Sequence, residues 1–234
     1  MESLVDYHFA SGVGTIGLND GKANVMSPRM LAEINRALDQ AESDAAAVVL
    51  AGRPGLFSAG FDLAILRKGD AETIEMLRDG FDLATRLLSF SGPVVIACTG
   101  HALAMGAFVL LSGDYRVGAA GDWKIGANEV AIGLPMPRPA LTIMQQRLTP
   151  AAFVRAAALA ETFNPANAIE AGWLDQVAPA NDVVSTAQAV ATRLASLDRK
   201  AHQITKRLMR AATVEAIGAG VEREYPLPPA SLEP

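Results

Sequence analysis

The fold is decided by an apolar run and the small-residue stretch after it, Pro93-Val94-Val95-Ile96-Ala97-Cys98 and Thr99-Gly100-His101-Ala102-Leu103-Ala104-Met105-Gly106-Ala107. The first run is short and rich in β-branched residues, which predicts a buried strand. The small residues after it allow the backbone to turn tightly and to approach a ligand closely. The apolar segment 108–111 then predicts a buried helix, whose first N–H groups would be unpaired and suited to an anion or a developing oxyanion.

A carboxylate in apolar surroundings follows about twenty residues further on. Glu129 is preceded by Ile125 and followed by Val130 and Ile132. Desolvation in such a setting raises the pKa of a carboxyl group, which suits a general base. The alternative, which the residues alone leave open, is an exposed loop glutamate.

The composition limits the class of protein. With 234 residues and 50% hydrophobic residues, the chain can bury a substantial core. A net charge of −5 argues against a nucleic-acid partner. The single cysteine excludes a disulfide within the chain, and the three histidines are scattered, so we expect a reducing compartment and no metal site. No export signal or membrane-spanning run is found, which predicts a soluble cytoplasmic protein without a membrane partner.

The first half of the chain alternates strands and helices. Segments 4–10 and 13–18 predict a hairpin, followed by a helix over 28–43, a strand over 45–51 and a helix over 74–88. This order indicates an α/β fold with crossover helices. The hairpin contains the pattern G-x-G-x-x-G, but its glycines fall within a predicted strand, which argues against a dinucleotide site.

A second small-residue turn, Ser58 to Phe61, lies in a predicted loop over 56–62. Two N–H groups, one from each turn, could converge on one oxygen, or the small residues could serve close packing; both interpretations stay open here. Ser58 does not fit the spacing G-x-S-x-G of a hydrolase nucleophile, and no histidine is singled out as its partner. His101 is a candidate pocket residue, with a packed or hydrogen-bonded role as the alternative.

The last third of the chain is predicted to be largely helical. Three prolines, at 135, 137 and 139, argue against regular structure until they are passed. Expected helices cover 150–160, 165–172, 183–197 and 202–216, with a short strand over 174–177 and a frayed tail over 225–229. The basic stretch 199–210 predicts a solvated helix face that could also meet phosphates.

Two of these stretches resemble the signature regions of the crotonase (enoyl-CoA hydratase/isomerase) superfamily. They are Phe57-Ser58-Ala59-Gly60-Phe61-Asp62-Leu63 and residues 99–107, the latter followed by Ser112-Gly113-Asp114-Tyr115-Arg116. Stretches 23–27 and 171–177 are similar to further family segments, and the likeness extends from about residue 5 to residue 216.

The resemblance implies an α/β fold, a spiral of ββα turns with a helical C-terminal region. We assign residues 1–180 to the spiral core and residues 181–234 to a C-terminal helical region that forms trimers or hexamers. The resemblance also implies an acyl-CoA substrate and no cofactor, since the CoA thioester is itself the substrate. The thioester oxygen would lie between the N–H groups of Phe61 and Met105, and Ala23 and Ala59 would line the path of CoA.

Two departures from the family pattern refine the expected activity. Hydratases of this family carry two glutamates, and the first would fall at Phe108, so only Glu129 is matched. A single glutamate is similar to the branch that converts 3-enoyl-CoA to 2-enoyl-CoA, with Phe108 as a pocket wall. The second departure is that the chain stops about where other members begin a last helix that binds the CoA phosphates. In addition, Met105 replaces the glycine that is common at that position.

Three hypotheses follow from these residues. The leading one is an enoyl-CoA isomerase that works through Glu129. The second is a hydratase, or another crotonase-type lyase or hydrolase, that uses Glu129 with an ordered water. The third, of a different class, is a non-catalytic acyl-CoA-binding protein.

Overall fold

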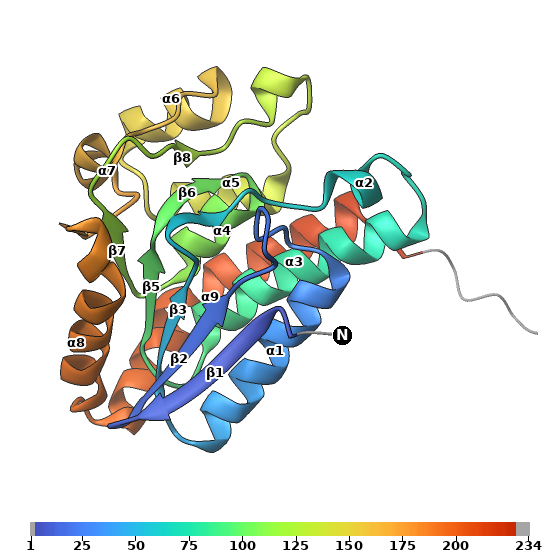
Figure 1. Cartoon of the computed structure of the whole chain (residues 1–234). Coiled ribbons are helices and arrows are strands. Elements are labelled where there is room, and N and C mark those ends of the chain that lie inside the picture. Colours follow the sequence, from blue (N-terminus) through green and yellow to red (C-terminus); the bar gives the residue numbers. More distant parts are fainter. Residues whose placement is uncertain (1–2, 228–234) are drawn as a thin grey trace, which may run out of the picture.

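The apolar runs form the central strands of a six-stranded sheet in the computed structural model, which describes residues 3–227 (Figure 1). Its strands, in order across the sheet, are β1 (Val5–Ala10), β2 (Val13–Leu18), β3 (Ala47–Ala51), β5 (Val94–Cys98), β7 (Tyr115–Ala119) and β9 (Gln176–Ala178). The predicted hairpin is confirmed, because β1 pairs antiparallel with β2. The other neighbours pair in parallel, as crossover connections require.

A second sheet of three parallel strands contains β4 (Gly55–Ser58), β6 (Gly100–Leu103) and β8 (Ile125–Gly126). The chain enters the two sheets alternately, so that β3 is followed by β4, β5 by β6 and β7 by β8. This repetition, with helices between the pairs, confirms the predicted spiral of ββα turns. The predictions that 56–62 is all loop and that 99–107 is all turn are wrong, since these short segments pair with one another. β7 and β8 were not predicted.

The helices connect and cover these strands. Those of the first two thirds are α1 (Pro28–Ser43), α2 (Leu63–Leu66), α3 (Ala71–Ser89), α4 (Met105–Ser112) and α5 (Arg138–Gln145). They are followed by α6 (Pro150–Leu159), α7 (Pro165–Ala171), α8 (Val183–Ala195) and α9 (Arg199–Glu224), with short 3₁₀ turns η1 (Val130–Ile132) and η2 (Ala180–Asp182). The cap predicted at Ser27 is present, because its hydroxyl accepts a hydrogen bond from Met30 N at 3.2 Å.

Three details of the C-terminal third correct the sequence-based expectations. α5 already begins at Arg138 and takes Pro139 into its first turn, where the missing N–H would have had no acceptor. α9 starts earlier and ends later than expected. Tyr225 is packed and not frayed, because its carbonyl accepts a 2.7 Å hydrogen bond from Arg78 and its ring stacks on Phe81. Residues 228–229 of the predicted tail lie outside the described part.

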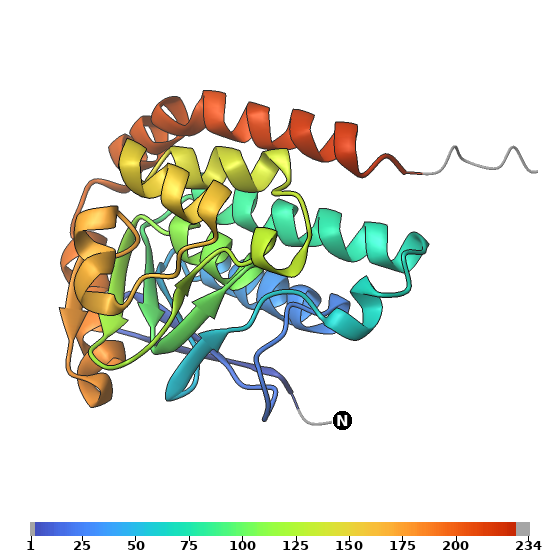
Figure 2. The same cartoon turned by 90° about the horizontal axis from the view of Figure 1, so that it is seen from above.

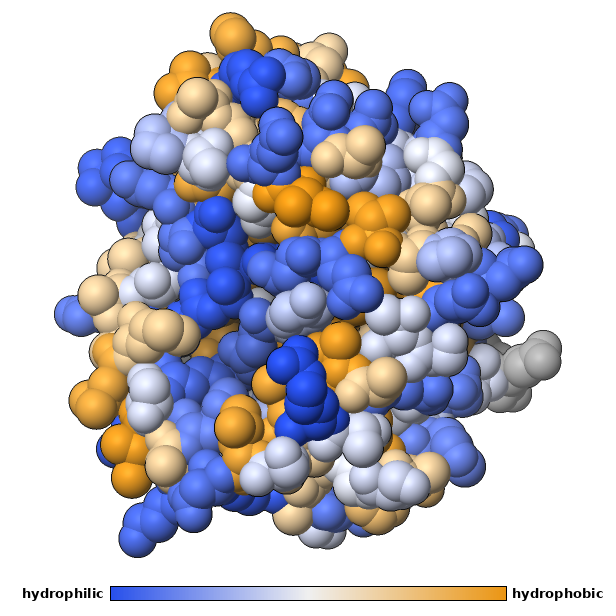
Figure 3. All heavy atoms as spheres, turned by 90° about the vertical axis from the view of Figure 1, so that its left-hand side faces the viewer, coloured by the Kyte–Doolittle hydropathy of each residue, from blue (hydrophilic) through white to orange (hydrophobic). Residues whose placement is uncertain are grey.

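Both faces of the large sheet are covered, which explains why its strands are continuous apolar runs. Along β3, Val48 and Leu50 pack toward α1, α3 and α4, whereas Val49 packs toward α8 on the opposite face. The outer surface over α8 mixes hydrophilic side chains with apolar patches (Figure 3). α9 runs beside α3 and α5 (Figure 2). Assembly through residues 181–234 stays a prediction.

None of the helices within residues 3–227 is both long enough and apolar enough to cross a membrane.

Candidate active site

A cavity of about 390 Å³ opens where the ends of the small sheet meet α3, α4 and the last turn of α9. Its lining is mostly apolar, which suits an acyl chain. The polar side chains are few and are those of Glu129, its neighbour Asn128 and Tyr225. Other lining residues, from segments far apart in the sequence, include Ala59, Phe61, Phe81, Ala104, Phe108 and Tyr225.

The first turn of the site follows β4 and is held by buried hydrogen bonds. The Ser58 hydroxyl donates to Asn24 O at 2.7 Å and accepts from Gly60 N at 3.1 Å. This fully buried hydroxyl therefore stabilises the turn and is not available as a nucleophile. Ala59 N donates to Ala23 O at 3.0 Å, so the two predicted CoA-path residues are brought together.

The second turn lies between β6 and α4. Ala104 has φ +50° and ψ −125°, an unusual conformation for a residue with a side chain, and its N–H donates to Gly126 O at 3.1 Å. Its carbonyl accepts from Ala107 N and Phe108 N, which begins the helix. No side chain caps this end of α4. The N–H of Met105, the first helical residue, is therefore left unpaired by the helix itself.

The two turns are in direct contact. A Cβ placed on Gly60, whose φ is +96°, would lie 2.8 Å from Ala104 Cβ and 3.2 Å from Met105 N. Neither the Phe61 N–H nor the Met105 N–H has a hydrogen-bond acceptor among residues 3–227. A pair of free N–H groups beside an apolar cavity, one of them at a helix N-terminus, is suited to stabilise a negatively charged oxygen.

Glu129 lies at the end of the segment after β8, where η1 begins. Its main-chain carbonyl accepts from Ile132 N and Leu134 N, which fixes the loop around it. Its side chain is half-buried, and the buried Oε2 atom has no hydrogen-bond partner in the part of the chain that the structure describes. Burial raises the pKa of Glu129 above its ordinary value of 4.5. A carboxylate in an apolar cavity, with one buried oxygen that has no partner among the described residues, is equipped to accept a proton.

Aromatic rings form one wall of the cavity. Phe108 is buried and stacks on Phe81 with ring centroids 6.4 Å apart, and Phe61 packs edge-on against Phe81 at 6.3 Å. Tyr225 stacks on the Phe81 ring at 6.1 Å. Sequence reasoning placed Phe61 and Phe108 here but missed Phe81 and Tyr225. The apolar periodicity of α3 marked Phe81 only as a core residue, and nothing local to Tyr225 points to the cavity.

Other candidate residues lie away from the cavity. His101 Nδ1 accepts a 2.9 Å hydrogen bond from Lys124 N, and its ring meets Trp123 edge-on, so it has the hydrogen-bonded role. The basic stretch of α9 is not a uniformly solvated face, because Lys206 and Arg210 are buried. Neither lines the cavity around Glu129.

Comparison with known proteins identifies what this arrangement is similar to. The sequence profile of the enoyl-CoA hydratase/isomerase family matches residues 8–227. The mitochondrial enoyl-CoA delta isomerase 1 of Mus musculus is 31% identical over 217 residues, which are 91% of this chain and 75% of that protein.

Solved structures agree with this assignment. An apo enoyl-CoA isomerase from Mycobacterium tuberculosis superposes with a TM-score of 0.91 at 46% identity, covering 95% of this chain and 97% of the other. An enoyl-CoA hydratase from Mycobacterium ulcerans superposes with a TM-score of 0.91 at 47% identity, covering 94% and 96%. Structures that are named as an isomerase and as a hydratase therefore match this chain at similar sequence identity.

Proposed function

Since the chain belongs to the enoyl-CoA hydratase/isomerase family of acyl-CoA enzymes, we propose that it shifts the double bond of a 3-enoyl-CoA to the 2-position. Glu129 removes a proton from carbon 2 of the thioester. The electrons move onto the thioester oxygen, and the N–H groups of Phe61 and Met105 stabilise the resulting enolate. Glu129 then returns a proton to carbon 4, which leaves the double bond between carbons 2 and 3.

The observation that carries this proposal is the single carboxylate. Among the described residues that line the cavity, Glu129 is the only carboxylate, and the buried ring of Phe108 lies where the resemblance would place a second glutamate. Addition of water to a double bond is work suited to two carboxylates, one to hold the water and one to manage its proton. Moving a proton between two carbons needs one base. The reaction needs no cofactor, because CoA is part of the substrate.

A direct assay tests the proposal. Purified protein given a 3-enoyl-CoA should form the 2-enoyl-CoA, and the same protein given crotonyl-CoA should form very little 3-hydroxyacyl-CoA. The two reactions are followed separately, by the conjugated thioester absorbance and by chromatography of the products. Hydration of crotonyl-CoA at a rate typical of good enzymes, ~10 s⁻¹ or more, with weak isomerisation, would replace the isomerase assignment by the hydratase alternative.

Phe108 should act only as a wall of the cavity. Phe108→Leu keeps the site apolar and removes the stacking on Phe81, so most of the isomerase activity should remain, within about tenfold, a change expected of altered packing around a substrate. The pH dependence of kcat should be unchanged, because no titrating group is lost. A shifted pH profile in this variant would show that Phe108 influences the base itself.

The hydratase alternative rests on relatives such as the Mycobacterium ulcerans protein, which bears that name at 47% identity. In that case Glu129 would hold and activate an ordered water in place of abstracting a proton from carbon. The product analysis described above separates the two reactions.

A further inference from the structure

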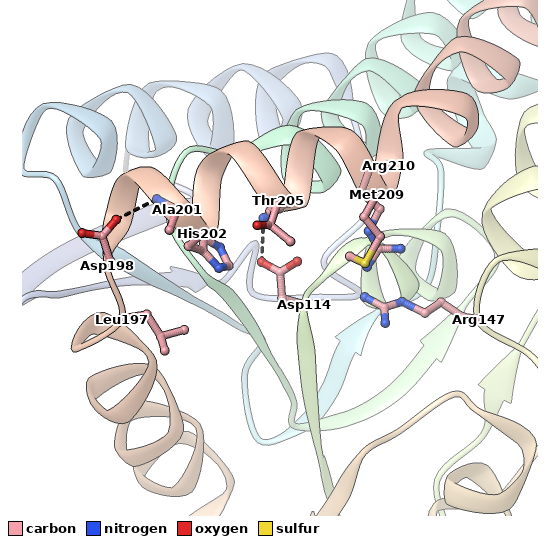
Figure 4. Close-up of a pocket in the computed structure, with 10 residues that line it drawn as sticks. Asp114, Arg147, Leu197, Asp198, Ala201, His202, Thr205, Met209 and Arg210 are labelled. Atoms are coloured by element: carbon pink, nitrogen blue, oxygen red, sulfur yellow. Dashed lines mark hydrogen bonds and ion pairs between the residues drawn. The ribbon is translucent and has the colours of Figure 1, made fainter.

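A second cavity, of about 400 Å³, lies between the first half of α9 and the turns that follow α4 and α5 (Figure 4). It shares no lining residue with the cavity around Glu129. Asp114 and Arg147 approach it from the body of the protein, and His202, Lys206 and Arg210 approach it from α9. The proposed isomerase reaction uses none of these side chains.

Two carboxylates of this region, those of Asp114 and Asp175, already accept hydrogen bonds from basic side chains. Asp114 Oδ2 accepts from Lys206 Nζ at 2.6 Å and from the Val94 main chain at 2.9 Å. Asp175 accepts from the side chain and the main chain of Arg116 at 2.7 Å and 2.8 Å. In each of these two ion pairs the cationic side chain is buried and is matched by one carboxylate.

Two further guanidinium groups, those of Arg147 and Arg210, form no ion pair with any carboxylate among residues 3–227, and they only share the more distant attraction of Asp114. Arg210 is 6% exposed, and it forms no hydrogen bond or ion pair with any residue between 3 and 227. Arg147 donates one hydrogen bond, from Nη2 to Gly113 O at 2.6 Å, and its buried Nε has no partner in the same part of the chain. Figure 4 shows Arg147 extending toward the stretch of α9 that carries Arg210.

Two guanidinium groups that are withdrawn from water without an ion-pair partner destabilise the folded state. A buried charge without a counter-charge loses its hydration and gains nothing in return. Burial, and then the positive charges of Arg116 and Arg210, lower the pKa of Arg147 to about 9, against the smaller opposing effect of Asp114 and Asp175. Burial likewise lowers the pKa of Arg210. A negatively charged group between the two guanidinium groups would remove this repulsion.

The remaining lining fits an oxyanion of one or two charges. The buried His202 Nε2 has no partner among the described residues. Asp198, the other carboxylate of the lining besides Asp114, lies at the start of α9, where it accepts from Ala201 N at 2.7 Å (Figure 4). Guanidinium groups present donors in a planar fork that matches the oxygens of carboxylate and phosphate.

We propose that this second cavity is a binding site for a small oxyanion, a phosphate or a carboxylate, held between Arg147 and Arg210. The ligand would supply the counter-charge that the described chain lacks, and it would tie α9 to the turn after α5. Binding should therefore stabilise the folded state as ligand concentration rises.

The test is a titration of the wild-type protein with sodium phosphate, against sodium chloride at matched ionic strength. Calorimetry should give saturable binding, and the unfolding temperature should rise with phosphate beyond the rise with chloride. Arg210→Met keeps an apolar stem in place and removes the unpaired charge. It should weaken phosphate binding at least tenfold and should unfold no earlier than wild type in phosphate-free buffer.

Arg207→Met is the matched control, because Arg207 is an exposed arginine on the same helix and the net charge changes equally. Its phosphate affinity should stay within about twofold of wild type, since a distant surface charge is screened. Absence of saturable binding to wild type, or full binding by Arg210→Met, would overturn the proposal. So would a fall in assembly mass of Arg210→Met, measured by light scattering, without any phosphate effect. That result would assign the counter-charge to a carboxylate of a second copy.

Discussion

Replacing Glu129 with glutamine should lower kcat for isomerisation about 10³-fold, the range expected when a general base is removed. Glutamine keeps the shape of the side chain but cannot accept the proton from carbon 2. No second carboxylate lines the described cavity, and burial raises the pKa of the Tyr225 phenol to about 12, so that group is not an available base at neutral pH. The affinity for an acyl-CoA that lacks the double bond should stay within a few fold, measured by calorimetry, since the cavity is unchanged.

The pH dependence of the wild-type enzyme supplies an independent readout. Burial raises the pKa of Glu129, so the ionised base is lost as pH falls through a value above the ordinary 4.5, and kcat/KM should fall there. A carboxyl group whose pKa is raised by folding favours the folded state at low pH, and this contribution is lost as pH rises. Glu129→Gln should therefore unfold no earlier than wild type at neutral pH.

Two results would contradict the role of Glu129 as the base. Substantial isomerase activity in Glu129→Gln would exclude Glu129 as the proton shuttle. Loss of acyl-CoA binding together with activity would show a structural carboxylate instead. A single base that accepts and returns one proton should also carry some deuterium from carbon 2 to carbon 4, diluted by exchange with water.

Gly60→Ala should lower kcat about 10²- to 10³-fold, the cost of misplacing one donor to a developing oxyanion. Gly60 has φ +96°, and an added Cβ would meet Ala104 Cβ at 2.8 Å and Leu103 O at 3.0 Å. The new methyl group therefore acts as a wedge between the two turns that present the N–H groups of Phe61 and Met105. Steady-state kinetics should show the loss mainly in kcat, because the acyl cavity itself is not filled.

Gly69→Ala is the control for backbone strain. Gly69 also has a positive φ, +64°, but an added Cβ would meet no atom within 4 Å. Both variants are strained by alanine in the left-handed region, a cost of about 1 kcal/mol, so both should unfold somewhat earlier than wild type. Only Gly60→Ala should lose activity beyond its loss of stability. Equal kinetic losses in the two variants would argue against the contact between the turns as the source of catalysis.

Much of the large sheet could be predicted from local patterns, because its strands are covered on both faces. A strand such as β3 or β5 then reads as an unbroken apolar run, and helix α3 reads as apolar residues at helical spacing. The strands of the small sheet carry no such signal. They have two to four residues each and are stabilised by pairing with segments far away in the sequence, so 56–62 was interpreted as loop.

The sequence by itself determined the α/β class, the family resemblance and the apolar setting of Glu129, because each depends on neighbouring residues and their spacing. Only the tertiary structure decided that Gly60 touches the turn at Ala104, that Tyr225 completes the aromatic wall, and that Arg210 is buried without a partner among residues 3–227. These facts depend on contacts between segments separated by 40 residues or more. Local periodicity reports which face of an element is buried but not what it is buried against.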